Sequence, residues 1–547
     1  MNARIYRAIA LLIATQFAIA CTPNNSPSGN QTELSMEKQS GSAPAEESAP
    51  EPGSTQDNKR YAKFRSEGDN QFNREQYDRI VENDFQLVQV KPLSTFSIDV
   101  DSASYSNVRR FINNGQLPPK DAVRIEEFIN YFTYDYPNPQ GDRPFSMVTE
   151  ISEAPWKRAH KLVHIGLQGK RLETENLPSS NLVFLLDVSG SMSSPNKLPL
   201  LKSAFQLLLD ELGEGDRVAI VVYAGAAGVT LPSTPATEKE TILEALNNLS
   251  AGGSTAGGEG IQRAYEVARE NFIESGNNRV ILATDGDFNV GVSSDAELVR
   301  LIEQKREQGI FLTVLGFGTG NLQDAKMEKL ADKGNGNYAY IDSILEAKKV
   351  LVNEIGATLL TIAKDVKIQV EFNPAKVAAY RLIGYENRQL QAQDFSDDTK
   401  DAGELGAGHS VTALYEVIPV GAKTNIELPS VDELEYQQTE IDASAYETNE
   451  LMQVKLRYKQ PDASESQLMV QPVVDAGVRL DATSENFRFS AAVAGFGMLL
   501  RDSKYKGEIT FEEVLELARE SRGEDANGYR AEFMRLVESS RLLNENQ

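Results

Sequence analysis

Cysteine and histidine are scarce in this chain of 547 residues, which contains one cysteine, Cys21, and three histidines. A single cysteine excludes a disulfide within the chain. The histidines His160, His164 and His409 show neither the spacing of a metal site nor that of a catalytic triad. In a strand-like segment the first two would lie on one face, about 13 Å apart. Because no nucleophile or acid–base pair stands out, we expect that the protein is not an enzyme.

An excess of positive charge and long apolar runs are also lacking. The chain has 55 Lys and Arg against 80 Asp and Glu, a formal net charge of −25, which disfavours electrostatic binding to nucleic acid or to an anionic membrane. No run of 18 apolar residues is available to span a membrane, and residues 490–500 are too short. A length of 547 residues with 40% hydrophobic residues favours a globular chain of about three or four domains.

The first residues have the pattern of a targeting segment. Arg4 and Arg7 precede an apolar stretch over residues 8–20, which predicts a secretory signal peptide over residues 1–20. The end of this stretch, Ala18-Ile-Ala-Cys21, is similar to the bacterial lipobox, although Leu is usual where Ala18 stands. That resemblance implies lipidation of Cys21, and several acyl chains anchor a protein stably. The alternative is a signal peptide followed by an incidental cysteine.

Residues 21–60 lack aromatic side chains and are rich in Ser, Pro, Glu, Gln and Asn. Such a composition cannot bury enough apolar surface to fold, so we expect a disordered tether. Lipid anchor and tether together predict a location in the bacterial cell envelope. If the host has two membranes, the outer membrane is favoured, with the protein on its periplasmic or surface face.

The most informative motif follows an apolar run over residues 181–186. Asp187, Ser189 and Ser191 place one carboxylate and two hydroxyls at every second position where a strand gives way to a turn. Oxygen ligands without sulfur or imidazole suit a hard cation, Mg²⁺ or Mn²⁺ before Zn²⁺. An open α/β sheet binds its ligands outside the carboxyl ends of its strands. The motif therefore predicts a metal-dependent binding site, although an Asp or Ser at this position by itself is often a helix cap.

Two further residues with oxygen-bearing side chains follow later in the sequence. Thr255 lies on the glycine-rich loop 252–255, and a second buried-strand pattern over residues 279–284 ends in Asp285. Together with D-x-S-x-S, these residues resemble the metal-ion-dependent adhesion site (MIDAS) of von Willebrand factor type A (vWA) domains. We expect Asp287, two residues beyond the motif, to be a solvated loop carboxylate.

The MIDAS resemblance implies both a metal and a partner. It implies an ion, Mg²⁺ with Mn²⁺ or Ca²⁺ as alternatives, held by Ser189, Ser191 and Thr255, with Asp187 and Asp285 binding directly or through water. One coordination position would remain for a Glu or Asp of a partner protein.

Strand and helix patterns alternate around this motif, which predicts an α/β, Rossmann-like, doubly wound and mostly parallel sheet for a vWA domain over residues 177–360. The expected strands are 182–186, 218–223, 280–284, 310–316 and 338–341. Within this range Gly316-Phe-Gly318-Thr-Gly320-Asn321 nearly imitates a dinucleotide fingerprint, but that fingerprint needs glycine at position 321. We therefore expect no nucleotide site.

The segments before and after the predicted vWA domain show other secondary-structure patterns. Residues 61–140 show helical periodicity, residues 141–176 and 365–480 alternate like β-strands, and residues 481–547 read as helices. The two β-like ranges flank the vWA domain, which suggests one β-sandwich with the vWA domain inserted.

The segment 94–103 ends in Asp99-Val-Asp101 and resembles the nucleophile loop of haloacid-dehalogenase phosphatases. That family needs Thr or Val where Ala103 stands and a Rossmann-like domain directly after. The simpler interpretation is that Asp101 or Ser102 caps the helix that carries residues 107–111.

Residues 94–136, the vWA domain, residues 371–386 and residues 487–497 together resemble the bacterial vWA-domain lipoproteins of the YfbK kind. The resemblance implies an architecture and no reaction. We expect a lipid-anchored envelope protein that binds an acidic protein ligand through Mg²⁺ in adhesion, assembly or a chaperone-like role. The alternatives are a metal-dependent hydrolase with its site in the flanking domains and a structural envelope scaffold.

Overall fold

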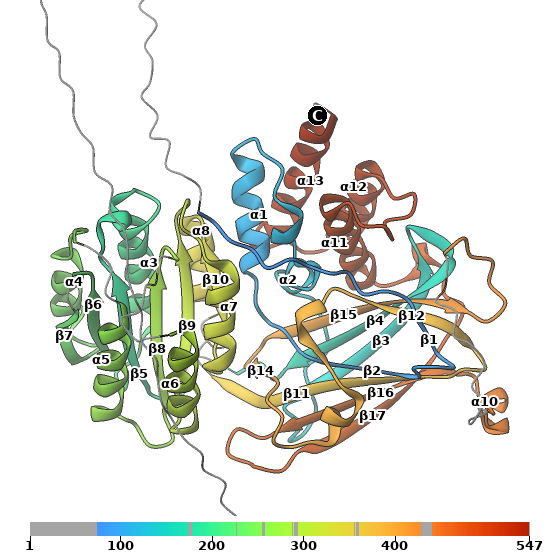
Figure 1. Ribbon diagram of the computed structural model, residues 1–547, viewed down its shortest axis with the longest axis horizontal. Helices are drawn as coiled ribbons and strands as arrows, with labels where there is room; N and C mark the ends of the chain where they lie inside the picture. The colour runs from blue at the N-terminus through green and yellow to red at the C-terminus, as the bar shows by residue number, and fades with distance from the viewer. Residues whose placement is uncertain are drawn as a thin grey trace, which may run out of the picture. The chain divides into compact units, whose positions relative to one another are not determined.

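The computed structural model describes residues 74–172, 178–225, 227–253, 257–286, 288, 294–354, 356, 360–426, 428 and 440–545. All of these residues belong to one compact unit. They form a parallel-sheet domain, a β-sandwich and a layer of helices (Figure 1).

The parallel-sheet domain is built on six strands in the order β10-β9-β8-β5-β6-β7. Their bounds are β5 (Ser180–Asp187), β6 (Arg217–Tyr223), β7 (Ala227–Pro235), β8 (Asn277–Thr284), β9 (Ile310–Phe317) and β10 (Tyr338–Ile341). All neighbours are parallel except β7, which runs antiparallel to β6 at the edge. Every residue of β5 and β8 is buried, as expected for central strands covered on both faces. The predicted mostly parallel, doubly wound sheet is confirmed.

Helices cover both faces of this sheet. Their bounds are α3 (Leu198–Glu211), α4 (Lys239–Asn247), α5 (Gly257–Glu270), α6 (Asp295–Glu307), α7 (Asp324–Lys333) and α8 (Ile344–Lys348), with a π-helical turn over Lys349–Asn353. α3, α4 and α8 share a hydrophobic core with one face, and α5, α6 and α7 share a core with the other. In sheets of this kind, ligands bind outside the carboxyl ends of the strands, between these two layers.

Two antiparallel sheets form the sandwich, with strand orders β1-β12-β15-β4-β3 and β13-β2-β11-β16-β17, and β14 pairs with β11. Their bounds are β1 (Gln86–Leu87), β2 (Leu93–Ser97), β3 (Phe145–Ala154), β4 (Lys157–Gly169), β11 (Thr361–Phe372), β12 (Val377–Ile383), β13 (Gln389–Leu390), β14 (Gly403–Gly406), β15 (Ser410–Pro419), β16 (Glu450–Lys459) and β17 (Gln467–Val474). Both sheets contribute to one core, for example Ile165 from β4 and Ile368 from β11. The chain therefore leaves the first sheet after β4, builds the parallel-sheet domain, and returns to the sandwich at β11.

A helical layer covers the outer face of the five-stranded sheet. It consists of α1 (Ala103–Asn113), α2 (Ile125–Asn130), α11 (Glu485–Arg501), α12 (Phe511–Glu520) and α13 (Tyr529–Glu545). Phe128 of α2 packs with Phe496 of α11 and with Leu162 of β4 in one core. Figure 1 shows the blue N-terminal helices beside the red C-terminal ones. The remaining short helices are α10 (Ala443–Glu447) and 3₁₀ turns at Lys120–Ala122, Gly190–Ser193, Glu386–Arg388, Ala392–Ser396 and Leu480–Ala482.

The region expected to be helical over residues 61–140 also contains β1 and β2, and β2 pairs with β11 in the sandwich. The capping expectation is wrong. Ser102 occupies the N-cap position of α1 but its side chain makes no capping bond. Instead the Ser104 N–H donates to Glu127 Oε2 at 2.7 Å, and Asp101 Oδ1 accepts the Tyr338 N–H at 2.8 Å. Tertiary partners thus replace the local cap.

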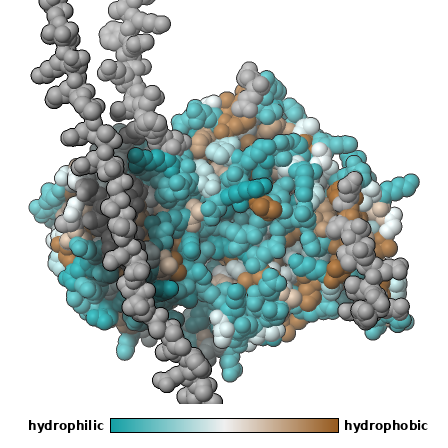
Figure 2. Space-filling view, in the orientation of Figure 1, coloured by the Kyte–Doolittle hydropathy of each residue, from teal (hydrophilic) through white to brown (hydrophobic). Residues whose placement is uncertain are grey.

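None of the described helices is long and apolar enough to cross a membrane. The face of the molecule in Figure 2 is mostly hydrophilic, with hydrophobic side chains in scattered small groups.

Candidate functional site

The first motif lies at the carboxyl end of β5. Asp187 is the last residue of β5 and is fully buried, and Ser189 is 2% exposed. The Ser189 N–H donates to Asp187 Oδ1 at 2.8 Å, which folds the chain back over the carboxylate. Ser189 Oγ lies 2.9 Å from Ser191 Oγ. One carboxylate and two hydroxyls therefore converge on a single turn, as the spacing of the motif predicts.

The neighbouring strand brings the second carboxylate. β8 lies parallel to β5 with Leu186 beside Ala283, so the two strands end side by side. Thr284 Oγ1 donates to Asp187 Oδ2 at 3.4 Å, and Asp285 follows, 1% exposed. Asp187 and Asp285 are thus held at the carboxyl ends of adjacent strands.

The glycine-rich loop reaches the same turn through its backbone. The Gly252 N–H donates to Val188 O at 2.8 Å, and the Gly190 N–H donates to Gly253 O at 3.1 Å. Thr255, the third predicted hydroxyl ligand, lies outside the described residues, as do Asp287 and the lipidation candidate Cys21.

Sequence reasoning missed one charged residue of the site, Lys197. Its Nζ donates to Asp285 Oδ2 at 2.7 Å, and both side chains are almost completely buried. Asn321 Nδ2 also reaches Asp285 Oδ2, at 3.4 Å. An ammonium group therefore balances one of the two carboxylates. No local signal marks Lys197, because the contact joins residues 88 positions apart.

The glycine-rich sequence that imitates a nucleotide fingerprint has a packing role here. Gly318 has φ +73°, and a Cβ at this position would lie 2.3 Å from the Lys197 side chain. Gly286 has φ +102°, and a Cβ there would lie 2.4 Å from Asn321 O. Both glycines are needed because the 318–323 segment packs directly on Lys197 and on the turn after Asp285.

The electrostatics of the site depend mainly on burial. Burial raises the pKa of Asp187 to about 6, and the nearby Asp285 adds to the rise, while hydrogen bonds from Ser189 oppose it. A raised carboxyl pKa means that negative charge is held there at a free-energy cost, which a bound cation offsets.

The residues present fit a hard divalent cation. Asp187, Ser189 and Ser191 offer an oxygen-only donor set on one turn, with Asp285 beside them. These four described residues, and Thr255 by the motif, are the ones that would hold the ion. A divalent cation held there would supply Lewis acidity at the end of β5.

None of the three histidines belongs to this turn, and His160 and His164 have structural partners. His160 Nδ1 lies 2.5 Å from Glu416 Oε1, and Arg381 pairs with the other oxygen of Glu416 at 2.9 Å. His164 Nε2 lies 2.7 Å from Tyr136 Oη, and burial lowers the pKa of His164 to about 3. Burial also lowers the pKa of His409, to about 4.

Comparisons with known proteins agree with this fold. The family model of the von Willebrand factor type A domain matches residues 181–353, and a model described as von Willebrand factor matches residues 71–164. The chain thus contains a vWA domain, a class that binds divalent metals at the MIDAS and typically takes protein ligands.

The flanking segments point to a narrower group. The model described as uncharacterized protein YfbK, C-terminal, matches residues 357–543. The chain is 45% identical over 469 residues to uncharacterized protein YfbK of Escherichia coli strain K12, covering 84% of this chain and 80% of that protein. This chain belongs to the YfbK family.

More distant similarities cover the vWA domain or parts of the body. A UPF0353 protein of Mycolicibacterium gilvum is 26% identical over 197 residues, 31% of this chain and 58% of that protein. A solved von Willebrand factor type A structure from Catenulispora acidiphila is 17% identical, with a TM-score of 0.40 over 72% of this chain and 90% of that one. Proximal thread matrix protein 1 of the mussel byssus, solved with a zinc-occupied MIDAS motif, is 24% identical with a TM-score of 0.27, over 32% of this chain and 45% of that one.

Proposed function

We propose that this protein binds an acidic group of a partner protein through a divalent cation, Mg²⁺ first, held at the turn after β5. The observation that carries the proposal is the convergence of Asp187, Ser189 and Ser191 on one turn, with Asp285 at the adjacent strand end. Ser189 and Ser191 are neutral, and Lys197 balances the charge of Asp285. Such an ion would therefore keep residual positive charge. A Glu or Asp carboxylate is the complementary ligand.

We propose binding rather than catalysis for this site. Asp285 is paired with Lys197, and Asp187 accepts hydrogen bonds from Ser189 and Thr284. A general base needs a carboxylate or imidazole that can reach a substrate proton. The arrangement supports capture of a ligand that is released chemically unchanged.

We further propose that the protein works in the bacterial cell envelope, anchored through lipid on Cys21, in adhesion, assembly of an envelope complex or a chaperone-like role. The support for the anchor is the sequence Ala18-Ile-Ala-Cys21 after an apolar stretch. The test is fractionation of cells that express the chain or its Cys21→Ser variant. The wild type should be found with membranes and the variant should not.

The partner is tested with the full chain as bait in an extract of its own cell envelope. Capture is compared in Mg²⁺ and in EDTA, with Asp187→Ala and the matched surface variant Asp210→Ala, whose side chain is 76% exposed. We expect a partner that is retained only in Mg²⁺, is lost with Asp187→Ala and is kept with Asp210→Ala. Equal capture in all arms contradicts a metal-dependent site, and a partner that is cleaved during capture would indicate a hydrolase.

A further inference from the structure

The first described residues of the chain, 74–77, lie against the 318–323 segment that follows β9. We call residues 74–77 the entry segment. The Arg74 N–H donates to Gly320 O at 2.8 Å, and the Gln76 N–H donates to Leu322 O at 2.9 Å. The two segments run parallel where they pair. The entry segment thus forms a short strand pair with a loop that already contacts Asp285 and Lys197.

A buried carboxylate fixes this pairing. Glu75 Oε1 accepts the Gly320 N–H at 2.9 Å, across 245 positions of the sequence. Arg110 of α1 donates to both oxygens of Glu75, at 2.7 and 2.9 Å. The side chains of Glu75 and Arg110 are 3% and 10% exposed. A bidentate ion pair fixes geometry, and removal of one partner of a buried pair is strongly destabilising. Glu75 therefore ties the entry segment to α1 and to the 318–323 segment.

The 318–323 segment covers the Lys197–Asp285 ion pair. Gly318 packs on the aliphatic stem of Lys197, where no Cβ would fit. Asn321 Nδ2 donates to Asp285 Oδ2 at 3.4 Å, beside the lysine ammonium. The side chains of Lys197 and Asp285 are 5% and 0% exposed. Because of this close packing, the ammonium can leave Asp285 only when the 318–323 segment moves.

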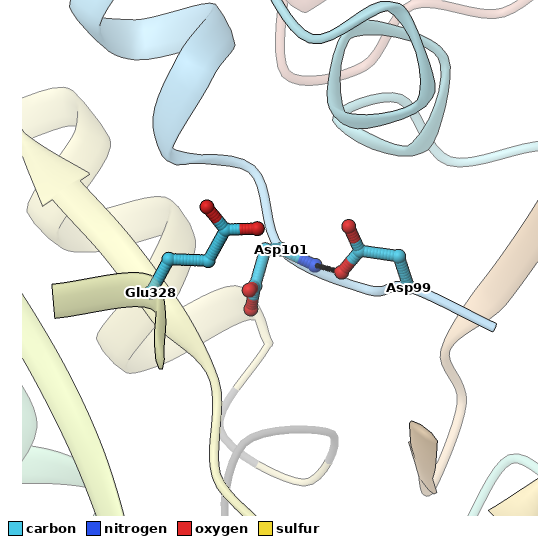
Figure 3. Close-up of side chains that lie close together, drawn as sticks. All are labelled: Asp99, Asp101 and Glu328. Carbon is cyan, nitrogen blue, oxygen red and sulfur yellow. Dashed lines mark hydrogen bonds between the residues drawn. The ribbon is translucent and has the colours of Figure 1, made fainter. Parts of the chain in front are cut away.

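The 318–323 segment leads into α7, and α7 is fixed by other contacts. Figure 3 shows Asp101 between Asp99 and Glu328 of α7. The guanidinium of Arg388 lies 3.2–3.5 Å from an oxygen of each of these three carboxylates. These contacts hold α7 to the chain before α1. The loop between β9 and α7 then depends for its position on the bonds that it makes with the entry segment.

We propose that the entry segment regulates the site after β5, with Glu75 as its positioning residue. It holds the 318–323 segment over Lys197, which keeps the ammonium on Asp285 and the Mg²⁺ affinity low. When the entry segment detaches, Lys197 can leave, and Asp285 becomes free for the ion. A site that binds only in its open state has an apparent affinity reduced by the fraction of open molecules. The inference rests on the proposed function, in which Asp285 belongs to the metal site.

The first measurement follows Lys197 and needs no metal. The full chain is treated with acetic anhydride in EDTA, and the acetylation rate of each lysine is followed by mass spectrometry. Lys239, whose side chain is 42% exposed, is the internal reference. We expect Glu75→Ala to raise the rate at Lys197 at least about tenfold, because a buried group reacts through local opening. An unchanged rate overturns the proposal.

Two controls separate local release from general loss of structure. Glu266→Ala also removes the acidic partner of an arginine, Arg263, but on the surface, with side chains 55% and 42% exposed. It should leave the rate at Lys197 unchanged. Lys349, whose side chain is 2% exposed, reports on unfolding of the domain. If Glu75→Ala accelerates Lys349 as much as Lys197, the variant opens the whole domain, and the proposal is overturned.

The second measurement is calorimetric titration of Mg²⁺ on the same variants. We expect Glu75→Ala to tighten Mg²⁺ binding by about three- to tenfold, and by no more than the factor gained in acetylation of Lys197, because both report the open fraction. Equal or weaker binding contradicts regulation by the entry segment. If the wild type binds no Mg²⁺, the proposed function fails, and acetylation still decides whether the entry segment holds Lys197.

Glu75→Gln covers the case in which Glu75→Ala fails to fold. Its amide oxygen can still accept the Gly320 N–H, but the charge that pairs with Arg110 is lost. We expect a smaller rise in both the acetylation rate of Lys197 and the Mg²⁺ affinity, with a melting transition that shows a folded protein. A folded Glu75→Gln variant that matches the wild type in both measurements overturns the proposal.

Discussion

The Lys197–Asp285 contact predicts that replacing the lysine changes metal binding and stability in opposite directions. Lys197 Nζ lies 2.7 Å from Asp285 Oδ2. With a metal–oxygen bond of about 2.1 Å, an ion bound directly by Asp285 would lie about 5 Å from the ammonium. At an effective dielectric constant of about 20, the repulsion between the doubly charged ion and the ammonium is about 7 kcal/mol. Binding through water and rearrangement of the side chain reduce it, so we expect Lys197→Met to tighten Mg²⁺ binding by about 10- to 100-fold, or ~1.4–2.8 kcal/mol.

The metal-free variant should be less stable. Removing one partner of a buried ion pair leaves an uncompensated charge, which costs about 3–5 kcal/mol. The assay is thermal unfolding in EDTA and in Mg²⁺, together with calorimetric titration of Mg²⁺. The matched control is Lys239→Met, because Lys239 pairs with Asp210 on the surface with 42% and 76% exposed side chains. We expect that control to change stability by under ~1 kcal/mol. If Lys197→Met has the same melting temperature and the same Mg²⁺ affinity as the wild type, the ion pair does not set the charge of the site.

Four further predictions concern pH and backbone space. Because the pKa of Asp187 is raised to about 6, Mg²⁺ affinity should fall as pH drops through 6 and level off above it; a flat titration from pH 5 to 8 would contradict this. Without metal, the same shift should make stability decrease as pH rises from about 4 to 6. The pKa of His164, lowered to about 3, predicts stability that is present above pH ~6.5 and lost as pH falls below it, a loss that His164→Gln should reduce in acid unfolding. Gly318→Ala should destabilise the protein by more than Gly115→Ala: both glycines have φ +73°, but only at 318 would the Cβ meet Lys197. Equal melting temperatures for the two alanine variants would argue against a tight fit there.

The strand-end motif was readable from the sequence because its geometry is local. In D-x-S-x-S, three short oxygen side chains alternate over five residues, so any tight turn after β5 brings Asp187, Ser189 and Ser191 together. The apolar runs before Asp187 and Asp285 identified two buried parallel strands, and parallel strands in register place their ends together. For the same reason the alternation of strands and helices was enough to predict the class of the domain.

Lys197 could not be predicted from the sequence. It is a charged residue in an ordinary turn, and its role depends on which carboxylate the fold brings beside it. The segment Asp99-Val-Asp101 shows the same limit. Its local sequence favours a helix cap, yet Asp101 accepts a hydrogen bond from Tyr338, 237 positions further along the chain.

The sequence by itself determined the class of the vWA domain and the grouping of oxygen-bearing side chains at the end of β5, because both depend on periodicity and spacing within a few residues. Only the tertiary structure decided the counter-charge at Asp285 and the reason for glycine at position 318. These features are set by pairs of residues from separate elements, whose electrostatic and packing energies exist only once the sheets and helices are assembled.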